Sequence, residues 1–266
     1  MRFSFLIASK RDYQSHAKKV VDSIIERCNG SDDYEIVLCH KDTIDDDRVV
    51  FVKDDAMAGS SHAFNLAYSK SVGDYVYVCV DDGIAHGDLM GAADFLESNI
   101  FADRKIKITT LPAVSGNDVI RFERRTAIND QRANRLLHLT DSFTDVYPFV
   151  VMCFPVIARE SVEKYLDGYI FHPRIKNCGD WWLGAYLYIN KEEGVQYNGA
   201  RFTIAKNRDF HYDIVFQDYR CKFGGEAWIN TYRLMKFYNH RLGYVYDTED
   251  DFITEEYLTT LAEFYL

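Results

Sequence analysis

Short apolar runs alternate with stretches of helical periodicity in the first third of the chain. Residues 3–8 form an apolar run that predicts a buried strand, and residues 13–28 repeat apolar positions at helical spacing. The same reasoning predicts the next four elements, which are strands over residues 35–39, 49–52 and 75–80 and a helix over residues 60–71. The order β-α-β-β-α-β is typical of the first half of a doubly wound α/β sheet.

The pattern is less regular in the rest of the chain. Residues 117–145 are polar and rich in arginine, and they are the stretch whose pattern is hardest to assign. Elsewhere the spacing predicts strands over residues 106–111, 149–158 and 201–205 and helices over residues 89–100, 160–166, 180–190, 226–241 and 254–266. We find no internal repeat or linker, so we expect one α/β domain over residues 1–215 with a helical C-terminal appendage, residues 216–266, packed on it.

Polar residues follow each of the first four predicted strands. In sheets of this kind, ligands bind beyond the carboxyl ends of the strands. The four strand ends are Ser9-Lys10-Arg11, His40-Lys41-Asp42, Asp54-Asp55 and Asp81-Asp82. Surface loops are polar as well, so the position predicts a binding site without specifying its ligand.

Charge and cysteine content narrow the class of protein. The formal net charge is −10, which disfavours general binding to phosphate backbones or anionic lipids, although a local basic patch at residues 121–135 is an exception. None of the six cysteines forms a CxxC pair, as expected for reduced thiols. No run approaches the roughly 18 apolar residues of a membrane span, so we expect a soluble, cytoplasmic protein.

Asp81 and Asp82 come directly after the apolar strand over residues 75–80. Two adjacent carboxylates repel each other unless a cation or hydrogen-bond donors lie between them. A hard divalent ion with oxygen ligands would remove the repulsion and could also hold substrate phosphates. The alternative is a solvated Asp-Asp-Gly turn, which Gly83 permits.

The order of motifs along the chain resembles the family-2 glycosyltransferases of the GT-A fold. That family has a small-residue loop, an Ala-x-Asn-x-Ala/Gly helix, a Gly-Asp/Glu-Tyr-Ile strand and an Asp-x-Asp motif. This chain has residues 59–67, then Gly73-Asp74-Tyr75-Val76, then the aspartate pair. Residues 156–162 are similar to the family's apolar-Arg-Arg-Glu-x-Phe segment, and Cys178-Gly179-Asp180-Trp181-Trp182-Leu183 is similar to its Glu-Asp-x-Asp/Trp segment. The resemblance covers residues 3–215.

The resemblance implies a mixed GT-A sheet flanked by helices and an inverting, metal-assisted transfer of sugar from a nucleotide-sugar donor such as a UDP-sugar. Asp82 matches the last aspartate of the metal motif and is the expected ligand of Mn²⁺ or Mg²⁺, whereas Val80 replaces the first aspartate. In the alternative register, shifted by one residue, Asp81 is the first aspartate and Gly83 replaces the last. His211 lies where the family often carries a histidine near the metal, and a structural role is the alternative. The expected donor-binding residues are Ser9, Arg11, Lys41, Asp42, Asp55, Asn65 and Asp81.

The same resemblance places the acceptor chemistry in the second half of the chain. Asp180 is the expected general base, which would remove the proton of the acceptor hydroxyl; the alternative is an N-cap of the following helix. Trp181 and Trp182 would wall the acceptor or sugar pocket, or else pack in the core. Arg121 and Arg124 would lie on the acceptor side, or else pair with acidic neighbours in a solvated loop.

Three functions remain open on the sequence. The first is a glycosyltransferase whose acceptor is a glycan, a protein, a small molecule or a modified DNA base, the last as in a phage-type enzyme. The second is a nucleotidyltransferase, although Ala8-Ser9-Lys10-Arg11 lacks the glycines of the phosphate loop usual in that class. The third is a non-catalytic sugar-binding domain of the same fold.

Overall fold

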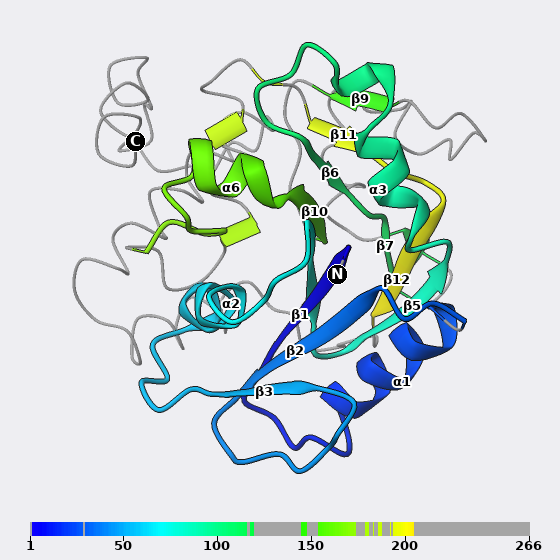
Figure 1. Cartoon of the computed structure of the whole chain (residues 1–266). Helices are drawn as coiled ribbons and strands as arrows, with labels where there is room; N and C mark the ends of the chain where they lie inside the picture. Colours follow the sequence, from blue (N-terminus) through cyan, green and yellow to red (C-terminus); the bar gives the residue numbers. More distant parts are fainter. Residues whose placement is uncertain are drawn as a thin grey trace, which may run out of the picture.

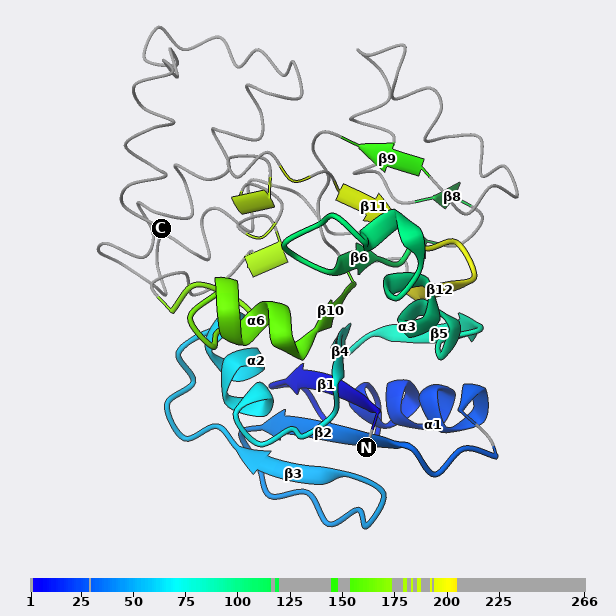
Figure 2. The same ribbon diagram turned by 45° about the horizontal axis from the view of Figure 1, so that its top comes forward.

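The computed structural model describes residues 2–28, 30–115, 118–119, 145–147, 154–173, 179–180, 183, 186–187, 192 and 194–204 (Figures 1 and 2). The six elements predicted in the first third are confirmed. They are β1 (Phe3–Ser9), α1 (Ala17–Arg27), β2 (Tyr34–His40), β3 (Val50–Lys53), α2 (Ser60–Tyr68) and β4 (Tyr75–Val80). The two predicted helices of the C-terminal appendage, residues 226–241 and 254–266, lie outside the described residues.

Helix α1 begins four residues later than the sequence predicts, at Ala17 instead of Tyr13. The reason is a local turn, because the carboxylate of Asp12 accepts hydrogen bonds from the amide of Ser15 at 2.9 Å and from its hydroxyl at 2.6 Å. Such side-chain bonds to nearby backbone compete with helical hydrogen bonding. The turn therefore occupies the segment in which the apolar periodicity had already begun.

The main sheet is mixed, with the strand order β3-β2-β1-β4-β10-β6-β11-β9. Its first four strands are parallel, and β10 runs antiparallel to both β4 and β6. The strands of the second half are β6 (Ile108–Thr110), β9 (Asp145–Tyr147), β10 (Pro155–Ala158) and β11 (Gly194–Gln196). Strand β10 begins at Pro155, as suits a residue that cannot donate to the sheet's hydrogen bonds.

A second, smaller sheet, which the sequence did not predict as such, continues directly from the aspartate pair. Its order is β5-β12-β7-β8. The strands are β5 (Gly83–Gly87), β7 (Ala113–Ser115), β8 (Asp118–Val119) and β12 (Ala200–Ile204). Gly83 therefore starts a strand, and a Cβ at this position would lie 3.0 Å from the ring of Phe202.

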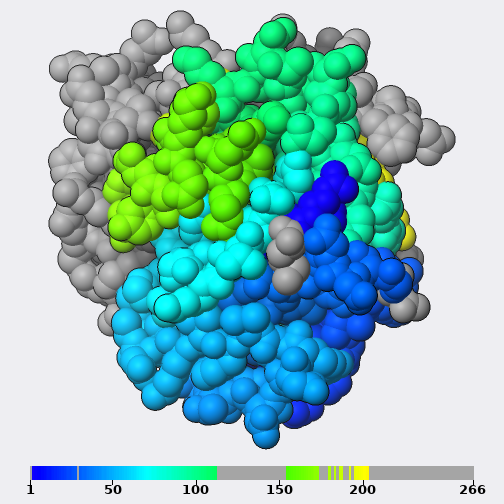
Figure 3. Space-filling model, in the orientation of Figure 1, coloured from blue at the N-terminus to red at the C-terminus, as the bar shows by residue number. Residues whose placement is uncertain are grey.

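Both faces of the parallel strands are buried. Alternate residues point to opposite faces, so that Phe5 belongs to one apolar cluster and Leu6 to the other. Helices α1 and α3 (Gly91–Leu96) cover the first face, and α2 and α6 (Arg159–Tyr165) cover the second. Figure 3 shows the segments of α2 and α6 side by side on one surface, where the hydroxyl of Tyr68 donates to the carboxylate of Glu163. Helix α3 is shorter than the predicted 89–100, because a 3-10 turn, Asn99–Phe101, follows it.

Three cysteines lie in the described part of the chain, and all three are free thiols in the interior, as the sequence predicts. Burial raises the pKa of Cys28 and of Cys39 to about 12, which keeps both thiols protonated and unreactive. Within the described residues, no helix has both the length and the apolar character needed to cross a membrane.

Candidate functional site

The carboxyl ends of β1, β2, β3 and β4 meet at one edge of the sheet, because these four strands are parallel neighbours. Hydrogen bonds connect the loops that follow them. Ser9 after β1 reaches Asp81 after β4, and the backbone amide of Asp54 after β3 donates to the carbonyl of His40 at 2.9 Å. The sequence expectation that these strand ends form one polar edge is therefore met.

Asp81 is the inner carboxylate of the pair. It is buried, and its Oδ2 accepts a hydrogen bond of 2.6 Å from the hydroxyl of Ser9. The Nε atom of Arg11 lies 3.6 Å from the same oxygen. A buried charge is stable only when it is paired or hydrogen-bonded, and Ser9 and Arg11 meet that requirement.

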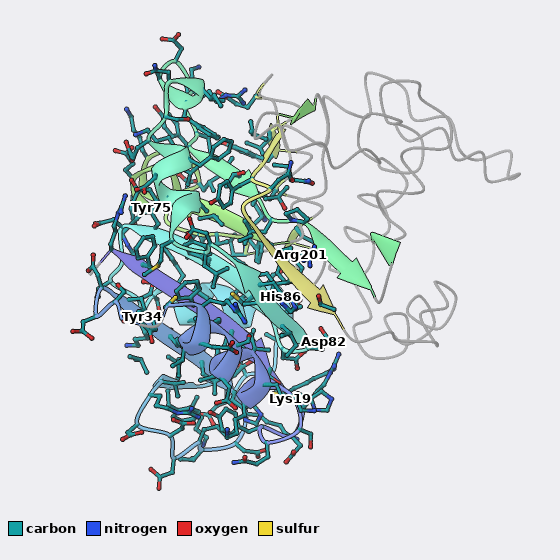
Figure 4. All side chains as sticks on the ribbon, turned by 90° about the vertical axis from the view of Figure 1, so that its right-hand side faces the viewer. Lys19, Tyr34, Tyr75, Asp82, His86 and Arg201 are labelled. Carbon is teal, nitrogen blue, oxygen red and sulfur yellow. The ribbon has the colours of Figure 1, made fainter. Side chains whose placement is uncertain are left out.

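Asp82 is the outer carboxylate, and its side chain is 19% exposed. Its Oδ2 accepts a hydrogen bond of 3.3 Å from Nη1 of Arg11. Strand β5 begins at the next residue, and Ile204 at the end of β12 pairs with Gly83, so Asp82 lies where the two sheets join (Figure 4). This position leaves the carboxylate at the edge of the fold, where a ligand can reach it.

Arg11 contacts both aspartates, which the sequence did not predict. The sequence indicated that a cation or donors must separate the two carboxylates, and a guanidinium and a hydroxyl meet this need in the structure. The Arg11 side chain is 40% exposed, whereas that of Asp81 is only 12% exposed. The cation therefore approaches the pair from the solvent side.

His40 at the end of β2 is a further residue that the sequence did not single out as a contributor to the site. It is 1% exposed, and its Nε2 lies 2.6 Å from the carbonyl oxygen of Arg11. The backbone amide of Asp42 donates to Nδ1 at 3.0 Å, so Nε2 carries the proton that the Arg11 carbonyl accepts. The imidazole therefore joins the loop after β1 to the loop after β2. In the sequence, a histidine at the end of an apolar run was the signal that could have identified this residue.

The residues expected to contact the nucleoside differ in how they are placed. Lys41 and Asp42 are exposed, and Nζ of Lys41 lies 3.8 Å from Oδ2 of Asp42. Asp55 is also exposed, and its Oδ1 lies 2.7 Å from Nζ of Lys53. Asp54 instead points inward, where its carboxylate accepts a hydrogen bond of 2.9 Å from the amide of Met57. Asp54 thus shapes the turn, and Lys41, Asp42 and Asp55 stay accessible to a ligand.

Asn65 on α2 makes two hydrogen bonds to the backbone of Phe171. Its Nδ2 donates to the carbonyl at 2.6 Å, and its Oδ1 accepts from the amide at 3.0 Å. Both polar atoms of the amide therefore make hydrogen bonds within the fold. One N–H of Nδ2 and one lone pair of Oδ1 remain for a further contact.

Asp180 is half-buried, and both Asp180 and the preceding Gly179 are helical. The aspartate therefore lies inside the helix and not at its N-cap, so the capping alternative is wrong for this residue. A Cβ on Gly179 would lie 2.4 Å from the ring of Phe171. The Phe171 ring therefore fills the space that a side chain at position 179 would need.

Several residues expected at the site lie outside the described residues. They are Arg121, Arg124, Trp181, Trp182 and His211.

Asp82 is suited to a hard divalent ion that is shared with a substrate. Among the described residues, no group of three or more His, Cys, Asp or Glu side chains could enclose a metal on its own. Mg²⁺ and similar ions are often held by one or two carboxylates together with substrate phosphates and water. Asp82 is the more exposed carboxylate of the pair and fits that arrangement, whereas Asp81 is buried and its Oδ2 accepts from Ser9.

The architecture is that of the GT-A fold. It is defined by the strand order, by the reversed strand β10 between β4 and β6, and by the polar edge at the strand ends. A fragment of TarS of S. aureus, residues 1–349 with UDP-GlcNAc, is similar with a TM-score of 0.55 and 13% identity over 99% of this chain and 71% of the fragment. The mannosyltransferase PcManGT of Pyrobaculum calidifontis, with GDP-Man and Mn²⁺, gives a TM-score of 0.56 and 12% identity over 98% of this chain and 69% of that protein.

GalNAc-T7 in complex with UDP, GalNAc and Mn²⁺ gives a TM-score of 0.58 and 13% identity over 96% of this chain and 55% of GalNAc-T7. No family model matches the sequence, and no curated protein matches it either. At these identities the similarity establishes the fold alone.

Proposed function

We propose that the chain is an inverting glycosyltransferase that transfers a sugar from a nucleotide-sugar donor to an acceptor hydroxyl with the help of Mn²⁺ or Mg²⁺. The observation that carries the proposal is the arrangement of Ser9, Arg11, Asp81 and Asp82 at the carboxyl edge of a GT-A sheet. UDP, UDP-GlcNAc or GDP-Man is bound in solved structures of the same fold, which supports a nucleoside diphosphate sugar as the donor.

Each side chain has a role that its placement supports. Asp82 would hold the divalent ion together with the donor's diphosphate, where the ion would neutralise the charge of the leaving group. Ser9 and Asp81 would fix the inner wall of the donor site, and Arg11 would add positive charge beside the diphosphate. Lys41, Asp42 and Asp55 are accessible for the nucleoside.

Asp180 would accept the proton of the acceptor hydroxyl. The acceptor oxygen then bonds to the anomeric carbon as the bond from that carbon to the diphosphate breaks, and the diphosphate leaves with the electron pair. Positioned proton removal typically contributes about 10²- to 10⁴-fold to the rate. The acceptor would be a glycan, a protein, a small molecule or a modified DNA base, and the Arg-rich segment would approach it.

A donor panel followed by mass spectrometry tests this function. The protein is incubated with UDP- and GDP-sugars and Mn²⁺, and release of the nucleoside diphosphate is measured with and without candidate acceptors. We expect one donor class to be turned over. Asp180→Asn should bind the nucleotide normally and lose about 10²-fold or more of the transfer rate. Full transfer activity in Asp180→Asn would contradict the base assignment.

A further inference from the structure

We propose that Arg11 is a built-in counterion of the metal anchor. Its guanidinium neutralises Asp81 and Asp82 in the donor-free protein, and it passes to the donor's diphosphate when a divalent ion takes Asp82. The inference rests on the proposed function, and it adds a device that couples metal binding to donor binding.

The first step of the argument is that two cations would share one carboxylate. Nη1 of Arg11 lies 3.3 Å from Oδ2 of Asp82, and Nε lies 3.6 Å from Oδ2 of Asp81. A divalent ion bound to Asp82 would bring two more positive charges close to the guanidinium. Charges of like sign at a few ångströms repel strongly near a protein surface. Arg11 and the metal therefore compete for Asp82.

The second step is that the Arg11 side chain can move without its backbone. The amide of Arg11 donates to the hydroxyl of Ser9 at 3.2 Å, and its carbonyl accepts from buried His40 at 2.6 Å. Both backbone groups are thus held by the ends of β1 and β2, while the side chain is 40% exposed. Rotation of the side chain can carry the guanidinium away from Asp82 while the loop stays in place.

The third step is that a diphosphate offers the guanidinium a new partner when the metal occupies Asp82. The planar fork of arginine binds pairs of phosphate oxygens, and such charge-assisted bonds are stronger than neutral ones. Once Arg11 has this new partner, the metal no longer competes with it for Asp82. Donor and metal should therefore bind with positive cooperativity, and the donor-free protein should hold the metal weakly.

The test compares Arg11→Met, which removes the charge at similar length, with Arg11→Lys, which keeps it. Arg27→Met is the matched control, because Arg27 is an exposed arginine whose ion pair with Glu26 belongs to α1. Mn²⁺ binding to the donor-free proteins is measured from the electron paramagnetic resonance signal of free Mn²⁺. Affinity for UDP and GDP is measured by calorimetry at saturating Mn²⁺.

We expect Arg11→Met to bind Mn²⁺ about two- to fivefold more tightly than the wild type, as loss of a partly exposed competing ion pair implies. The same variant should bind the nucleoside diphosphate roughly tenfold more weakly, because a charge-assisted contact is lost. Arg11→Lys and Arg27→Met should bind Mn²⁺ like the wild type. Arg11→Gln replaces Arg11→Met if the latter fails to fold.

The proposal would be overturned if Arg11→Met binds Mn²⁺ as tightly as the wild type or more weakly. It would also be overturned if neither the wild type nor Arg11→Met binds Mn²⁺. If Arg11→Met binds Mn²⁺ more tightly but no nucleoside diphosphate binds any of the proteins, the counterion role stands. The proposed function and the passage to the diphosphate would then fail.

Discussion

At the scale of single residues, contacts with Ser9 and Arg11 explain how two adjacent aspartates remain at the end of a buried strand. Ser9 donates to the inner carboxylate, and Arg11 lies within ion-pair distance of both. His40 in turn fixes the backbone of Arg11. These contacts connect the buried imidazole of His40 to the aspartate pair.

Substitution of His40 tests that dependence. His40→Ala would leave the Arg11 carbonyl and the Asp42 amide without their partner, and the loss of each hydrogen bond costs roughly 0.5–1.5 kcal/mol. We expect a lower free energy of unfolding in urea and weaker UDP binding. His40→Gln, which keeps a donor for the Arg11 carbonyl, should lose less than His40→Ala. His62→Ala, at an exposed position, serves as the control. A His40→Ala protein as stable as the wild type would contradict the role.

At the scale of secondary-structure elements, helix α2 is linked to the segment that carries Asp180. Asn65 holds the backbone of Phe171, and the ring of Phe171 packs against Gly179, the residue before Asp180. Because the ring fills the space at Gly179, a glycine there allows the helix containing Asp180 to lie against Phe171. The position of the proposed base is thus determined by a loop and a helix that are distant in sequence.

A second substitution tests this packing. Gly179→Ala would place a Cβ 2.4 Å from the Phe171 ring, and overpacking of this kind typically costs about 1–3 kcal/mol. We expect a lower melting temperature and slower transfer, with UDP affinity little changed. Adding Phe171→Leu should recover part of the loss, which a double-mutant cycle measures as a coupling energy. If the cost of Gly179→Ala is the same with and without the ring, the contact is not the reason for the glycine.

At the scale of the whole molecule, local and distant interactions differ in how far the sequence reveals them. The parallel strands β1, β2 and β4 were predicted because each is a continuous apolar run buried on both faces. The small sheet was missed because its strands are short and β5 pairs with β12, more than a hundred residues away in sequence. The contacts of Arg11 with Asp81 and Asp82 and of Asn65 with Phe171 were missed for the same reason, since periodicity reports only local structure.

The central claim is that Asp82 and a nucleoside diphosphate jointly bind a divalent ion, and the melting temperature measured with UDP or GDP, with and without Mn²⁺, tests it most directly. The account predicts a rise of roughly 5 °C that requires both nucleotide and metal and is lost in Asp82→Asn. It would be contradicted if no nucleoside diphosphate raises the melting temperature in the presence of Mn²⁺, or if Asp82→Asn shows the same rise as the wild type.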